Sequence, residues 1–241
     1  MGNFRNNVFL FIILTGSSAA IYLVQYAIFK DPTNTAYYFF QDMAFVPIQA
    51  LIATLLINKF LSITEHQRKM KKINVIISTF FVETGVEIIM QLSRFDQNPG
   101  KEREIAEIED LISNKSSAVK KTVDLFDYDF YADPEKLDEL AVVMSRNRRF
   151  LLDLLGNPNL LEHESFTDML WAVFHIADEL KSRGDLKKLT EADILHLSND
   201  MLRAYKAMTI EWIGYINYLK GEYPFLYAIA IRKSPFEAEG N

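Results

Sequence analysis

One uncharged apolar segment near the N-terminus constrains this chain more than any other feature. Residues 8–29 read VFLFIILTGSSAAIYLVQYAIF and contain no charged side chain. A helix rises about 1.5 Å per residue, so a segment of this length crosses the hydrocarbon layer of a bilayer, which is about 30 Å thick. We therefore predict a transmembrane helix here, and the lipid bilayer is the first partner that the sequence implies.

A second apolar segment, residues 43–61, follows after a short polar connection. In that connection Asp31 and Pro32 have the types expected at a helix cap and a first helical turn. The aromatic run at 37–40 is typical of the membrane–water interface. We predict that residues 1–62 form an antiparallel transmembrane hairpin.

Basic residues predict the orientation of this hairpin. Cytoplasmic flanks of membrane spans are rich in lysine and arginine. Five such residues surround the end of the second span: Lys59, Arg68, Lys69, Lys71 and Lys72. We expect both termini to lie in the cytoplasm. A cleaved signal peptide is the alternative, suggested by Arg5 and the small residues 18–20, but cleavage would leave an apolar remnant at 21–29.

Small residues lie near the middle of the first span. Gly16, Ser17 and Ala20 allow another helix backbone to approach closely. They are our candidates for helix packing in the membrane. The contact is either with the second span of the same chain or with another copy in a homo-oligomer.

Residues 63–95 are predicted to form a basic collar and a stalk helix. The stretch 73–92 is apolar enough to suggest a third span, but it contains Glu83 and Glu87. Each acidic residue near a bilayer centre costs about 2.5–3.5 kcal/mol. We predict a buried or oligomer-facing cytoplasmic helix, with a third span as the alternative. The second span either continues into this stalk or a new helix starts at Ser62.

Residues 96–241 are predicted to be an acidic cytoplasmic helical domain. The whole chain has a net charge of −6, although residues 1–72 hold seven basic against three acidic residues. So acidic a domain repels nucleic acid, and a chain without cysteine has no disulfide or thiolate site. No long stretch alternates with a period of two. The predicted fold class is therefore all-α, with a two-helix transmembrane hairpin followed by a cytoplasmic helical bundle.

Caps and apolar periodicity predict the helices of this domain. Shorter helices are expected near 102–113 and 117–126. Three longer ones are expected to open at Asp133-Pro134, at Ser165 and at Thr190, and the last carries an apolar stripe as far as Leu219. A terminal helical turn follows, too short to span a bilayer.

Metal binding is the sharpest chemical hypothesis. Bundle metal sites use histidine and acid three or four residues apart, because that spacing places both on one helix face. His175 precedes Asp178 and Glu179, and Asp193 precedes His196. The metal candidates are His175, Asp178, Asp193 and His196. Solvated charges are the competing interpretation, and no cofactor is otherwise predicted.

Motifs for other chemistry are absent from the sequence. There is no cysteine, no Gly-x-Ser-x-Gly elbow and no glycine-rich phosphate loop. No catalytic or cofactor-binding residue is assigned. We expect a protein that is not an enzyme.

Two stretches carry a resemblance. Residues 157–180 read NPNLLEHESFTDMLWAVFHIADEL, and residues 212–236 read WIGYINYLKGEYPFLYAIAIRKSPF. They resemble a family of uncharacterised prokaryotic membrane proteins with two N-terminal spans and a helical C-terminal domain. The resemblance implies a prokaryotic inner membrane and brings no activity.

Three functions follow as hypotheses. The first is a non-enzymatic, homo-oligomeric membrane protein, channel-like in one version, whose cytoplasmic domain assembles or gates the membrane part. The alternative is a membrane-anchored sensor or scaffold whose helical bundle binds a partner protein, a metal or a small ligand. A bundle metalloenzyme is a third.

Overall fold

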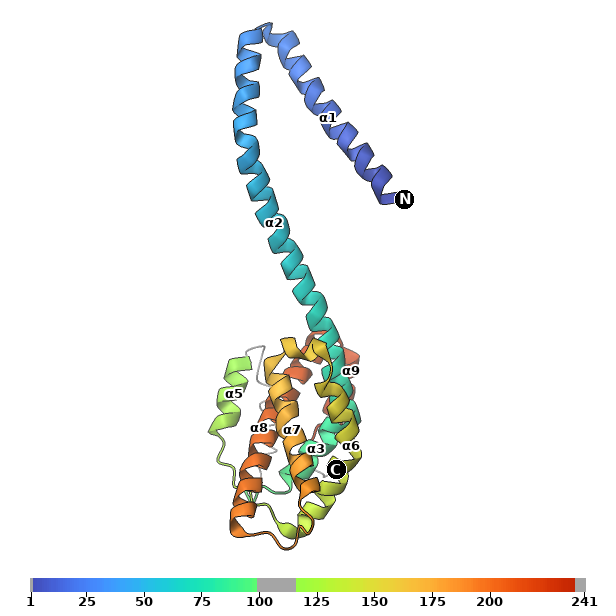
Figure 1. The fold of residues 1–241 in the computed structure, drawn as a ribbon, viewed down its shortest axis with the longest axis vertical. Helices are drawn as coiled ribbons and strands as arrows, with labels where there is room; N and C mark the ends of the chain where they lie inside the picture. Colours follow the sequence, from blue (N-terminus) through green and yellow to red (C-terminus); the bar gives the residue numbers. More distant parts are fainter. Residues whose placement is uncertain (1, 99–115, 237–241) are drawn as a thin grey trace. The chain divides into compact units, whose positions relative to one another are not determined.

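A computed structural model describes residues 2–98 and 116–236. The described residues form helices and loops, and their pairing between strands is limited to one isolated bridge that joins Asp96 to Phe130. The all-α prediction is thus confirmed (Figure 1). The chain divides into two compact units, Met1–His66 and Gln67–Asn241. The helix expected near 102–113 lies outside the described residues.

The N-terminal unit contains α1 (Gly2–Phe29) and the first part of α2 (Pro32–Phe80). Between them, Lys30 has a positive φ of 48° and Asp31 caps α2. The Asp31 carboxylate accepts hydrogen bonds from the backbone N–H groups of Thr33 (3.0 Å) and Asn34 (3.1 Å). This confirms the predicted cap, because these N–H groups have no carbonyl partner inside the helix.

Side chains of the N-terminal unit are exposed almost throughout. Tyr22 is an exception, because its hydroxyl donates to Asp42 at 2.8 Å and its ring meets Phe39 edge to face. Gly16 faces open space, since a Cβ added there would have no neighbour within 4 Å. Val8–Phe29, together with part of the helical stretch Pro32–Ser93, is long and apolar enough to cross a membrane. That is a finding of length and composition alone.

Helix α2 continues without a break through Ser62. It is followed by the π-helix η1 (Phe81–Gly85) and by α3 (Val86–Ser93). The apolar face of this stretch is buried in the C-terminal unit: Ile73, Ile77, Phe80, Phe81, Ile88, Ile89 and Leu92. The prediction of a buried helix over 73–92 is therefore confirmed.

The remaining helices complete the C-terminal unit: α5 (Ser116–Leu125), α6 (Pro134–Leu155), the 3₁₀ helix η2 (Pro158–Glu162), α7 (Glu164–Ser182), α8 (Glu191–Glu222) and α9 (Pro224–Ile231). Helix α7 packs between α6 and α8, and α8 also contacts α3, α5 and α9. The predicted stripe of α8 is buried from Leu197 to Leu219. Trp212 and Tyr205 are the largest fully buried side chains of this core.

Two of the three predicted helix starts are confirmed. Asp133 caps α6, and Thr190 with Asp193 forms a capping box on α8. The start at Ser165 was wrong, because α7 begins at Glu164 and His163 is its cap. Nδ1 of His163 accepts from the N–H of Phe166 at 3.3 Å. An unprotonated imidazole nitrogen accepts as a hydroxyl does, and η2 ends next to it.

Candidate metal centre

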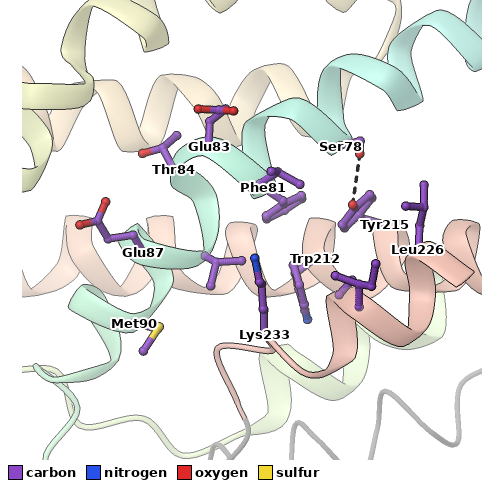
Figure 2. A pocket seen from close by; sticks show the side chains of 14 residues that line it. Ser78, Phe81, Glu83, Thr84, Glu87, Met90, Trp212, Tyr215, Leu226 and Lys233 are labelled. Atoms are coloured by element: carbon purple, nitrogen blue, oxygen red, sulfur yellow. Dashed lines mark hydrogen bonds between the residues drawn. The ribbon is translucent and has the colours of Figure 1, made fainter.

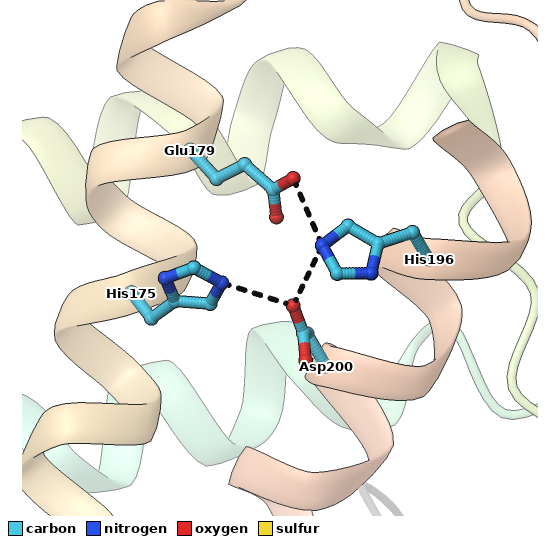
Figure 3. A group of neighbouring side chains, drawn as sticks. All are labelled: His175, Glu179, His196 and Asp200. Atoms are coloured by element: carbon cyan, nitrogen blue, oxygen red, sulfur yellow. Dashed lines mark ion pairs between the residues drawn. The ribbon is translucent and has the colours of Figure 1, made fainter. Parts of the chain in front are cut away.

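Four side chains of α7 and α8 converge on one point. His175 and Glu179 come from α7, and His196 and Asp200 come from α8 (Figure 3). Within each helix the pair is spaced by four residues, so both side chains project from the same face. One ligand atom from each residue lies within 4.8 Å of the other three. Two neighbouring helices thus supply a mixed nitrogen and oxygen donor set.

The separations between donor atoms match those around a small cation. Oδ2 of Asp200 lies 3.2 Å from Nε2 of His175 and 3.3 Å from Nε2 of His196. Nε2 of His196 lies 3.3 Å from Oε1 of Glu179. Ligands at about 2.0–2.1 Å from a tetrahedral Zn²⁺ are about 3.3–3.4 Å apart. The remaining donor pairs lie no more than 4.8 Å apart, so binding an ion requires them to close by up to about 1.5 Å.

Two carboxylate oxygens in the cluster have no hydrogen-bond partner in the described structure. They are Oδ2 of Asp200 and Oε2 of Glu179, and both are buried. The histidine rings come close to Asp200 without the alignment of a hydrogen bond. The side chains of Asp200 and Glu179 are 10% and 13% exposed. An unsatisfied buried acceptor costs about 1–3 kcal/mol, and a coordinated cation removes that cost.

Two arginines hold the carboxylates in place. Arg203 pairs with Oδ1 of Asp200 at 3.1 Å, and Arg183 donates to Oε1 of Glu179 at 2.6 Å. The hydrogen bonds to Glu179 and then to Asp193 raise the pKa of Arg183, so its guanidinium stays charged. Arg203 binds Oδ1 of Asp200 and leaves Oδ2 to the histidines, whereas Arg183 binds Oε1 of Glu179, the same oxygen that lies nearest to Nε2 of His196. This limits the repulsion between the two acids.

The structure brings together two of the four predicted metal candidates, His175 and His196. Asp178 instead pairs with Arg148 at 2.7 Å, and its side chain is 57% exposed. Asp193 serves the capping box of α8, where the hydroxyl of Thr190 and then Arg183 lower its pKa to about 2. The acidic residues of the cluster are Glu179 and Asp200, in place of the predicted Asp178 and Asp193.

A repeated spacing in the sequence could have identified the acids. His175 and Glu179 form one His-x-x-x-acid pair, and His196 and Asp200 form the second. Glu83 and Glu87, a further pair with the spacing of four, lie away from this cluster, and Glu87 pairs with Arg146.

Solvent can reach the cluster. The side chains of His175 and His196 are 50% and 54% exposed. A groove of about 700 Å³ between α5, α7 and α8 is lined in part by His175 and Arg203. Glu211 also lines it, and burial raises the pKa of that carboxyl. A small molecule in the groove could therefore approach a cation bound at His175.

The chain matches known sequences along nearly its whole length. Residues 2–61 match the family described as MJ1433, N-terminal helical domain, and residues 69–232 match that described as Uncharacterized protein MJ1433, C-terminal helical domain. The uncharacterised protein MJ1433 of Methanocaldococcus jannaschii is 38% identical over 239 residues, which cover 98% of this chain and 96% of that protein. No solved structure matches.

Proposed function

Because the chain belongs to the family of the uncharacterised protein MJ1433, and that family brings no activity with it, we propose a function from the side chains themselves. The C-terminal helical unit binds one divalent transition-metal ion between α7 and α8. The function is that of a metal-binding sensor or scaffold that is anchored to a membrane.

The convergence of His175, Glu179, His196 and Asp200 carries the proposal. Two imidazoles and two carboxylates form a donor set that suits Zn²⁺, Fe²⁺ and other transition metals better than Mg²⁺ or Ca²⁺, which prefer oxygen alone. Zn²⁺ is the first candidate because the closest donor separations fit four-coordinate geometry.

The position of the site suggests how a bound metal ion affects the folded C-terminal unit. A bound ion would add a further link between α7 and α8, which are already joined by side-chain packing and by Arg183, the C-cap of α7, through its ion pair with Asp193. Ligation by both helices stabilises the folded unit by a free energy that rises with the logarithm of the metal concentration once that concentration exceeds the dissociation constant. The half-exposed histidines leave one side of the ion open to a partner group.

Metal analysis of the full-length protein tests the proposal. The protein is purified in mild detergent without chelator or histidine tag, and its metal content is measured by mass spectrometry. We expect one transition-metal ion per chain, and uptake of Zn²⁺ by stripped protein in calorimetry. His196→Gln should weaken binding by at least about tenfold. His66→Gln, which changes an exposed histidine of α2, is the matched control. Equal binding by the two variants would falsify the proposal.

Membrane anchoring is part of the same proposal. The N-terminal unit exposes large apolar side chains along both helices, among them Phe9, Phe11, Leu55 and Phe60. Such surfaces are unfavourable in water and favourable in lipid. We place the spans at 8–29 and 43–61, in a prokaryotic inner membrane with both termini in the cytoplasm.

The absence of cysteine makes this orientation measurable. Asn34→Cys places one thiol in the connection between the spans, and Lys188→Cys places one in the loop between α7 and α8. A membrane-impermeant maleimide should label the first in intact spheroplasts and the second only after lysis. The reverse pattern contradicts the orientation.

Self-association through the first span is a second proposal. The apolar side chains of α1 are exposed, and open space surrounds Gly16. A neighbouring copy could use that space, with Ser17 and Ala20 beside the contact. Channel-like conduction would need several copies, because a pair of helices cannot enclose a water path.

A further inference from the structure

A second site lies elsewhere in the C-terminal unit, and it is an apolar cavity. Its volume is about 380 Å³, and its walls come from the end of α2, η1, α3, α8, α9 and the residues just after α9. Small-molecule sites occupy about 300–1,000 Å³ and are mostly apolar with a few placed polar groups. This cavity is at the small end of that range.

Aromatic rings form its inner wall. Phe81 stacks on Tyr215 with ring centroids 5.3 Å apart, and Phe81 also meets Trp212 edge to face at 5.3 Å. The hydroxyls of Tyr215 and Ser78 lie 3.1 Å apart and hydrogen-bond to each other. Trp212 and Phe81 are each 1% exposed. The inner wall is therefore closely packed and offers apolar contact to a ligand.

The wall nearest the rings contains the π-helix η1. A Cβ on Gly85 would lie 2.7 Å from side-chain atoms of both Phe80 and Phe81, so the local geometry depends on glycine. Thr84 is a lining residue of the cavity, and its buried hydroxyl has no hydrogen-bond partner among the described residues. Single π-helical turns are frequent at functional sites.

The rim of the cavity is open and apolar. Val82 is 71% exposed, Leu226 is 47% exposed and Ile229 is 41% exposed, and all three line the cavity. An apolar chain can therefore enter from the surface.

A single cation reaches into this apolar space. Figure 2 shows the Lys233 ammonium between Phe81 and Trp212, whereas the carboxylates of Glu83 and Glu87 point away from it. Glu87 is already paired with Arg146. Lys233 makes no ion pair with the described part of the chain. Lys233 is exposed, so its ammonium can pair with a negative group at the mouth of the cavity while an apolar chain lies inside.

We propose that this cavity binds a single-chain anionic amphiphile, with the apolar chain against Phe81 and Trp212 and the carboxylate or phosphate head on Lys233. A chain of moderate length suits the volume. A lipid with two long chains exceeds it, so the ligand is a free amphiphile rather than a bilayer lipid. This site is separate from the proposed metal centre and does not depend on it.

The two tryptophans of the chain allow a direct test. Trp171 is 56% exposed and lies outside the cavity, so the full-length Trp171→Phe protein in detergent reports from Trp212 alone. A bromine atom quenches tryptophan fluorescence at contact distance. The probe is ω-bromo-octanoate, and the matched probes are ω-bromo-octanol and ω-bromo-octylammonium. We expect saturable quenching, tightest with the carboxylate.

Two variants and one control sharpen the test. Lys233→Met should weaken the carboxylate by at least about tenfold and leave the alcohol unchanged. Ala230→Leu fills the cavity and should abolish quenching, whereas Ala228→Leu changes an exposed position of the same helix and should not. If Ala230→Leu disturbs the fold, the test rests on Lys233→Met, in which binding of the carboxylate should weaken and binding of the alcohol should not.

The proposal is overturned by equal quenching by the three probes, by quenching that does not saturate, or by quenching of folded Ala230→Leu equal to that of Ala228→Leu. Tighter quenching by a brominated two-chain phospholipid than by the octanoate also overturns it, because it makes a bilayer lipid the ligand.

Discussion

Nε2 of His175 lies 3.2 Å from Oδ2 of Asp200, although the two residues come from different helices and Arg203 holds the other oxygen of the carboxylate. That oxygen is buried and accepts no hydrogen bond in the described structure. The relationship joins α7 to α8 through atoms that a cation could share.

Zinc should stabilise the C-terminal unit against heat. The chelated full-length protein is heated with and without Zn²⁺, and unfolding is followed by tryptophan fluorescence, which arises only from the C-terminal unit. A ligand at one hundred times its dissociation constant adds about 2.7 kcal/mol to the folded state. His175→Gln should lose this gain, whereas His66→Gln should keep it. Equal stabilisation of both variants by Zn²⁺ would place the metal elsewhere.

Acid should remove the stability that Asp193 contributes. The pKa of its carboxyl is about 2 in the folded protein and lies below the ordinary value of 3.8, first because Thr190 donates to it and then because of Arg183. A carboxyl with a lowered pKa contributes stability above its unfolded pKa, and this is lost as the pH falls through the folded pKa.

The stability gap between wild type and Asp193→Asn should therefore be full above about pH 4 and shrink towards pH 2. Urea unfolding in the presence of chelator measures it. Asp153→Asn, an exposed change on α6, is the control for charge. A gap that is constant over this range contradicts the prediction.

Gly85→Ala should destabilise the C-terminal unit. The new methyl would meet the rings of Phe80 and Phe81 at 2.7 Å, and both rings are held in the core. Overpacking of this kind costs about 1–3 kcal/mol. Gly214→Ala on α8 meets nothing within 4 Å and should stabilise the helix by up to about 1 kcal/mol. Urea unfolding of both variants checks the opposite signs.

Gly16→Ile should reduce self-association in detergent. The larger side chain occupies the open space that we assign to a neighbouring copy. Ser18→Ile lies about 200° around the helix and should leave the assembly intact. Light scattering corrected for bound detergent gives the mass of each variant. A monomeric wild-type protein excludes the proposal at once.

Helix positions in the C-terminal unit were predictable because their signals are local. Capping side chains that hydrogen-bond within one turn mark the starts of α6 and α8. They belong to Asp133, which precedes Pro134, and to Thr190 with Asp193. The start of α7 was misplaced because Ser165 is a common cap and histidine is a rare one. The order of residues does not reveal that η2 brings the His163 ring into position.

The chemistry of the site was only half predictable. His175 and His196 were predicted because each has an acidic residue three or four positions away on a predicted helix. Asp178 and Glu179 are adjacent in the sequence and about 100° apart around the helix, so the packing of α7 on α8 decides which acid faces inward.

An all-helical protein with an apolar N-terminal region was predictable from the sequence. The evidence was the pattern of apolar residues, the helix caps and the uncharged segment 8–29, and these properties act over one or two helical turns. Only the tertiary structure brought Asp200 to the two histidines, and only it placed Lys233 beside Phe81 and Trp212. Contacts between residues so far apart in the chain depend on the angle and register at which whole helices pack. That choice is made by the complete core and by no single segment.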